Sequence, residues 1–126
     1  MKTAKLALAA LLLAPLLPLA QAALAHHSYS MFDMQRSVPL QATVTQFKWQ
    51  NPHAFIQANV QTPEGTEAWS IEMTSPNNLI QSGWRRTTLR TGDRVTIWVH
   101  PLRNGSRGGA YAGIRLPDGS TLGEVD

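Results

Sequence analysis

The sequence predicts a mostly β domain, a small antiparallel barrel of OB-like form with five to six strands and one short helix between strands three and four. Apolar and polar residues alternate with period two in several segments, which is typical of strands buried on one face. The predicted order is three strands, a short helix and two or three more strands, as in a small OB-type barrel. No predicted helix is long enough for a crossover, so a parallel sheet is not expected. A simple antiparallel sandwich is the alternative.

The first expected strand begins at Leu40, where Leu40, Ala42 and Val44 alternate with polar residues. The apolar phase then shifts to Phe47 and Trp49, and such a shift within a strand predicts a β-bulge. The other expected strands cover residues 54–60, 69–73, 95–99, 110–116 and 121–125.

The segments between these strands carry turn and helix signals. Thr62–Gly65 is typical of a hairpin turn, and residues 103–109 indicate a flexible loop. Between strands three and four, Ser75 is an expected N-cap, Pro76 suits the first helical position and Gly83 follows the end. These signals predict one or two turns of helix.

The N-terminal segment is typical of an export signal. Lys2 and Lys5 precede an apolar run over residues 6–19, and small residues over 20–25 offer a cleavage site. A cut after Ala25 is favoured over one after Ala22 by its distance from the apolar run. The run is too short and proline-broken to span a membrane. We therefore expect a signal peptide (1–25), an N-terminal arm (26–38) and a barrel domain (39–126), located in the periplasm or secreted.

Composition gives further limits on structure and partners. The chain has no cysteine, so apolar packing must stabilise it without disulfides. The formal net charge of +3 includes both lysines of the predicted signal, so the whole chain is more basic than its exported part. Residues 84–115 hold one acid, Asp93, against seven arginines: Arg85, Arg86, Arg90, Arg94, Arg103, Arg107 and Arg115. This distribution predicts either a basic face or an ordinary solvated surface.

The four histidines are candidate metal ligands: His26, His27, His53 and His100. After cleavage at Ala25, the amine and ring of His26 would form a chelate that, with a second imidazole, suits copper(II). The methionines at 31 and 34 are candidate soft ligands for copper(I). No known metal-binding spacing is present. The alternative is that His26 and His27 are exposed terminal residues and that the other two histidines hydrogen-bond to turns.

Aromatic residues give a second, different hypothesis. Phe55, Trp98 and Tyr111 alternate with core positions, so we expect them on the outer face of the barrel, near Arg115. Such a face could stack a sugar or another planar ligand, as OB-type folds do. With the arginines it would suit an acidic glycan or a lipid, or a protein partner in the envelope. The alternative is that these rings pack beneath the arm or the short helix.

Other function classes have little support in the sequence. Cysteine nucleophiles are excluded, and no serine nucleophile elbow is present, so we expect no enzyme activity. Basic residues with aromatics can bind single-stranded nucleic acid, but the export signal makes that partner unexpected. No cofactor is predicted apart from the candidate copper.

Three sequence blocks resemble a known family. They are Ala25-His26-His27-Ser28, Asn51-Pro52-His53-Ala54 and His100-Pro101-Leu102-Arg103-Asn104-Gly105. The chain is similar in these blocks, over essentially its whole exported part, to small exported proteins of Gram-negative bacteria that are classed as a domain of unknown function. The resemblance implies no activity. It implies only that all four histidines fall in blocks typical of the family.

Overall fold

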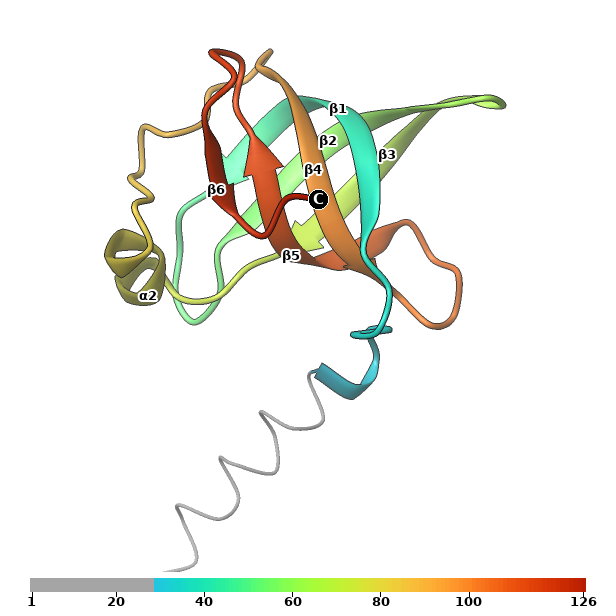
Figure 1. Cartoon of the computed structure of the whole chain (residues 1–126), viewed down its shortest axis with the longest axis horizontal. Helices are drawn as coiled ribbons and strands as arrows, with labels where there is room; N and C mark the ends of the chain where they lie inside the picture. Colours follow the sequence, from blue (N-terminus) through green and yellow to red (C-terminus); the bar gives the residue numbers. More distant parts are fainter. Residues whose placement is uncertain (1–28) are drawn as a thin grey trace, which may run out of the picture.

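A computed structural model of the chain describes residues 29–126 (Figure 1). The predicted signal peptide, both of its candidate cleavage sites, and His26 and His27 lie outside the described residues. The elements are β1 (Val38–Lys48), β2 (Phe55–Thr62), β3 (Gly65–Glu72), α2 (Pro76–Gln81), β4 (Arg94–Pro101), β5 (Gly108–Arg115) and β6 (Thr121–Gly123).

The strands form one sheet in the order β3-β2-β1-β4-β5-β6, and an additional pairing of β3 with β5 closes five of them into a barrel. The short helix α2 lies between β3 and β4 in the chain. The predicted fold class, a small OB-like barrel with one helix between strands three and four, is confirmed. The last strand, β6, adds to the free edge of β5 outside the closed barrel.

The pairing that closes the barrel is parallel, whereas all other strand pairs are antiparallel. Ser70, Ile71 and Glu72 of β3 pair with Gly108, Gly109 and Ala110 of β5. The expected, mostly antiparallel barrel is therefore closed by one parallel pair. A parallel pair needs a long connection, and here the connection contains α2 and β4 instead of a single crossover helix.

The β-bulge predicted in the first strand is confirmed. The register between β1 and β2 shifts between Val44 and Gln46, so that Phe47 opposes Ile56. Val44 and Ile56 are buried, and Phe47 packs against the same core. The bulge therefore lets one long strand keep its apolar side chains on the inner face on both sides of the phase shift.

Four strands, β1, β3, β4 and β5, begin earlier than expected, and the reasons are clearest for β3 and β5. β3 begins at Gly65 because its first half forms a two-stranded ribbon with β2, whose mostly exposed side chains carry no clear alternation. β5 begins at Gly108, within the segment that we expected to be a flexible loop. A Cβ at Gly108 would lie 2.9 Å from Leu102 Cδ1 and 3.1 Å from the Ser70 carbonyl oxygen. This glycine allows close packing of the strand rather than flexibility.

The predicted helix is confirmed as α2. The Ser75 hydroxyl accepts a hydrogen bond from the Asn78 backbone N–H, and Pro76 occupies the first turn. Leu79 is buried in the core, whereas Ile80 is exposed. The helix therefore buries Pro76 and Leu79, and Leu79 joins the core.

The core contains the inward side chains of the closed strands. A row of aromatic rings extends it, with Trp84 between Phe47 and Tyr111 at centroid distances of 5.7 and 5.3 Å. Trp84 is 1% exposed. The buried residues that form this core cluster are Leu40, Ala42, Val44, Ala54, Ile56, Ala58, Val60, Ile71, Met73, Leu79, Trp84, Leu89, Val95, Ile97, Val99 and Ile114.

The described part of the N-terminal arm is docked on the barrel. Phe32 is buried and forms a bridge with Leu102. The Asp33 N–H donates to the Pro101 carbonyl oxygen at 2.8 Å, and the Arg103 N–H donates to the Met31 carbonyl oxygen at 2.9 Å. The arm is thus held against the loop between β4 and β5.

Candidate functional site

The two described histidines have similar surroundings. His53 Nδ1 lies 2.8 Å from the Met73 carbonyl oxygen, and His100 Nδ1 lies 2.7 Å from the Arg36 carbonyl oxygen. A carbonyl oxygen only accepts hydrogen bonds, so each Nδ1 is the donor. In the neutral ring, Nε2 then keeps a free lone pair. Both histidines therefore make the hydrogen bonds to backbone that the structural alternative expects, and both retain one nitrogen able to bind a metal.

The strand register relates the two histidines through Glu72. His53 Nδ1 lies 3.4 Å from a carboxylate oxygen of Glu72. Glu72 pairs with Ala110, and Ala110 pairs with His100 on the next strand. Two strand spacings, about 10 Å, therefore separate the backbone of Glu72 from that of His100. Within residues 29–126, no three histidine, aspartate or glutamate side chains are grouped to hold a metal ion.

Phe55, Trp98, Tyr111 and Arg115, which we expected on one outer ligand-binding face, do not form a single group in the structure. Trp98 and Arg115 lie together, with the Arg115 guanidinium carbon 5.3 Å from the Trp98 ring centre. Tyr111 instead packs edge-on against Trp84, and its hydroxyl donates to the Leu122 carbonyl oxygen at 3.0 Å. Phe55 lies on β2, opposite Glu72 of β3.

Trp98 points to the outer face, as alternation with the fully buried Ile97 and Val99 requires, yet it is only 5% exposed. Its partner in register is Gly113, and the backbone of Glu124 lies against Gly113. Arg115 also lies over the ring. Trp98 is therefore placed to orient Arg115, and little of its face is free to stack a ligand directly.

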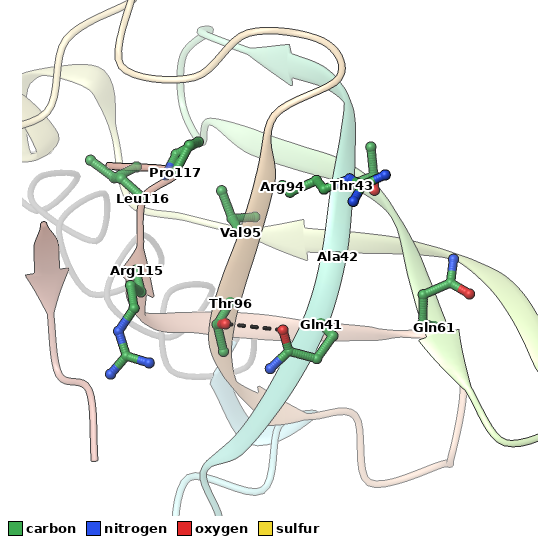
Figure 2. A pocket seen from close by; sticks show the side chains of 10 residues that line it. All are labelled: Gln41, Ala42, Thr43, Gln61, Arg94, Val95, Thr96, Arg115, Leu116 and Pro117. Atoms are coloured by element: carbon green, nitrogen blue, oxygen red, sulfur yellow. Dashed lines mark hydrogen bonds between the residues drawn. The ribbon is translucent and has the colours of Figure 1, made fainter. Parts of the chain in front are cut away.

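A hollow of about 430 Å³ lies beside this pair, on the outer face of the barrel (Figure 2). Its lining comes from four strands and the turn after β5: Gln41, Ala42, Thr43, Gln61, Arg94, Val95, Thr96, Arg115, Leu116 and Pro117. The Thr96 hydroxyl donates to the Gln41 side-chain oxygen at 3.2 Å, which connects β1 to β4 across the hollow.

The hollow contains two arginines and no acidic residue. Among the described residues, no carboxylate lies within ion-pair distance of Arg94 or Arg115. Arg94 and Thr96 are alternate residues of β4, and Thr96 opposes Arg115 in register. The two arginines are thus diagonal neighbours on adjacent strands, with backbones about 8 Å apart. In Figure 2 the two side chains extend apart, with Arg94 directed toward Thr43, so a ligand that contacts both guanidinium groups must be an extended one.

Sequence reasoning identified Arg115 but missed most of this lining. In the sequence, Arg94 stands out only as part of a basic segment, and no motif links Gln41, Thr43 and Gln61 to it. Their outward positions follow from the same alternation that identified the core, since Gln41 and Thr43 flank the buried Ala42. Only the register between strands shows that these positions meet at one hollow.

The fold and the hollow define the chain as a small OB-like barrel protein with a polar, arginine-bearing outer face. The model of a family of unknown function, DUF6152, matches residues 13–111, and the chain belongs to this family. The predicted membership in a family of unknown function is therefore confirmed. Neither the curated proteins nor the solved structures contain a match to the chain. In the described part of the chain, no helix has the length and apolar character to cross a membrane.

Proposed function

We propose that the protein is an exported binding module that recognises an acidic glycan in the hollow on its outer face. The observation that carries this proposal is the pair Arg94 and Arg115, which share a hollow of about 430 Å³ and have no carboxylate partner among the described residues. Surface arginines near acids usually form ion pairs. Two arginines left without such partners in one concavity favour an anionic ligand.

The neutral lining favours a glycan over a small inorganic anion. The Gln41 amide nitrogen and the Thr96 hydroxyl oxygen lie in the hollow beside the arginines, while the Gln61 amide is hydrogen-bonded to the Thr66 hydroxyl. These groups donate and accept hydrogen bonds, as the hydroxyls of a sugar require. A carboxylate on the sugar would accept two parallel hydrogen bonds from one guanidinium. An acidic glycan uses both kinds of group at the same time.

The predicted export signal supports a glycan of the cell envelope as the ligand. A protein cleaved after Ala25 would act outside the cytoplasm, in the periplasm or the medium, where nucleic acid is scarce. We propose a binding role for the hollow, since the sequence shows no catalytic motif among its lining residues. An acidic glycan of the cell envelope therefore fits both the two arginines of the hollow and the predicted location of the protein.

Affinity electrophoresis through native gels tests this proposal. Polygalacturonate in the gel is expected to retard the protein, and the neutral polymer dextran is not. Replacing both Arg94 and Arg115 by Gln is expected to weaken retardation at least about tenfold, since each substitution removes charge-assisted hydrogen bonds. Arg86→Gln is the matched control, because Arg86 is an exposed arginine outside the hollow. Equal retardation of all three proteins would refute the proposal.

Copper binding is a second candidate function. It is favoured by the Nδ1 hydrogen bonds of His53 and His100, because a backbone carbonyl on one ring nitrogen is the usual support of a metal-binding histidine. In this hypothesis, the amine and ring of His26 bind copper together with Nε2 of His53 or His100. His27 and the methionines at 31 and 34 are further candidate ligands.

The intact mass of the exported protein, measured under native conditions without chelator, tests the copper hypothesis. The copper hypothesis predicts the mass of a chain that begins at His26 and carries one copper ion. Adding one residue before His26 is expected to abolish binding, because the terminal amine moves away from the ring. A chain that begins at Ala23, or one that stays free of metal in added copper, would exclude this hypothesis.

A further inference from the structure

The docked arm holds a cluster of apolar side chains in solvent. Among the described residues, four large hydrophobic side chains are exposed, and three of them are Tyr29, Met31 and Met34. Their exposed fractions are 47%, 50% and 45%. Single exposed apolar residues are ordinary, whereas three such side chains within residues 29–34 of one docked segment favour a binding surface. We name Tyr29, Met31 and Met34 the arm cluster.

The cluster is held in place by its neighbours. Phe32, between the two methionines, is 4% exposed and forms a bridge with Leu102. The backbone of Met31 accepts from the Arg103 N–H, and the Asp33 N–H donates to Pro101. The arm thus buries one apolar residue and presents the others outward on a fixed backbone. Figure 1 shows this segment beside the loop between β4 and β5.

Arginines lie on the arm and on the adjoining loop, and the Arg103 Nε–H donates to the Ser30 carbonyl oxygen of the arm at 3.2 Å. Arg36 follows it in the chain, and Arg103 and Arg107 lie on the adjoining loop, with exposed side chains. Asp33 is the one acid within the arm, and its carboxylate lies 4.0 Å from Arg103. Arg107 pairs with Glu67 of β3 at 3.5 Å. Arg36 has no carboxylate partner among the described residues.

We infer that the arm cluster, with Arg36 and Arg103, docks the protein onto a membrane surface rich in anionic lipid. Methionine and tyrosine side chains insert at the boundary between headgroups and acyl chains, while arginines contact lipid phosphates. A second copy of the chain is disfavoured as the occupant, since it would bring the same arginines into contact with one another. This surface is separate from the hollow that carries the proposed glycan site.

Flotation of the exported protein with lipid vesicles tests the inference. The protein is expected to float with vesicles that contain phosphatidylglycerol and not with vesicles of phosphatidylcholine alone. Replacing Met31 and Met34 together by Ser is expected to reduce the vesicle-bound fraction about tenfold. Ile80→Ser is the matched control, because Ile80 is 45% exposed but lies on α2. Equal flotation of the two variants would overturn the inference.

Oxidation of the methionines by peroxide gives a second readout that does not depend on the variants. Phosphatidylglycerol vesicles are expected to slow the oxidation of Met31 and Met34, because inserted sulfur atoms are less accessible to peroxide. Protection that appears without lipid and grows with protein concentration would identify a second copy as the occupant and overturn the inference. The double variant of Arg94 and Arg115 is expected to float as the unaltered protein does. A failure of the glycan proposal can therefore be told apart from a failure of the membrane inference.

Discussion

The guanidinium carbon of Arg115 lies 5.3 Å from the centre of the Trp98 ring, at the edge of a hollow that also contains Arg94. A cation over an aromatic face is attracted by the electrons of the ring. The ring also restricts the rotamers that a long arginine side chain would otherwise sample. The Trp98 ring therefore orients the Arg115 guanidinium and leaves its N–H donors free to bind a ligand.

Arg115→Lys is expected to weaken binding to acidic glycan about threefold, although the charge is kept. Lysine lacks the planar group that stacks on Trp98 and binds a carboxylate with two parallel hydrogen bonds. Arg94→Lys is the comparison, because Arg94 has no aromatic partner in the described structure. If Arg115→Lys and Arg94→Lys lose the same affinity, the stacking on Trp98 contributes nothing particular to the site.

The stability of the protein is expected to fall above pH 10 through Tyr111. Burial raises the pKa of Tyr111 from 10.0 to about 12, because the phenolate loses hydration among apolar neighbours. A raised pKa in the folded state favours the protonated form, so this contribution is complete below pH 10 and declines as the pH rises toward 12. By pH 12 the free energy of unfolding should have decreased by about 2 kcal/mol.

Urea unfolding at increasing pH measures this loss. Tyr111→Phe is the control, because it keeps the ring beside Trp84 and removes the ionisable hydroxyl. We expect the stability of the unaltered protein, relative to that of Tyr111→Phe, to fall by about 2 kcal/mol as the pH rises from 10 to 12. A constant difference over this range would show that the Tyr111 phenolate is tolerated in the fold.

Gly113→Ala is expected to displace the segment that follows β6 and to expose Trp98. A Cβ at Gly113 would collide with the backbone of Glu124, whose N–H donates to the Ala112 carbonyl oxygen. Backbone atoms cannot move aside as a flexible side chain can. Tryptophan emission of the variant should shift to longer wavelength, and its melting temperature should fall. Unchanged emission would show that this segment does not cover Trp98.

Much of the fold was predictable because core-facing apolar residues recur at every second position of several strands. This holds for Ala54, Ile56, Ala58 and Val60 and for Val95, Ile97 and Val99, while Ser75, Pro76 and Gly83 are strong local signals for the ends of a short helix. The bulge after Val44 was visible as a change of phase. The parallel pairing of β3 with β5 was not visible, because strand direction depends on contacts between distant segments.

The candidate site was only partly predictable, because it too depends on contacts between segments that are distant in the sequence. Alternation correctly placed Trp98 on the outer face, but it could not show that Arg115 and Glu124 cover that side of the sheet. Tyr111 was assigned to the same face, whereas a shift in register between β4 and β5 turns it toward Trp84. A bulge changes which face each later residue occupies. Whether His26 joins a metal site stays a prediction, since it lies outside the described residues.

The binding role of the hollow is tested most directly by isothermal titration of the exported protein with oligogalacturonate at low and high salt. We expect binding at low salt that weakens as salt screens the two guanidinium groups, and a loss of at least about tenfold in the Arg94→Gln, Arg115→Gln double variant. Binding that is equally strong in the double variant, or heat of binding that is absent at low salt in the unaltered protein, would contradict the proposed glycan site.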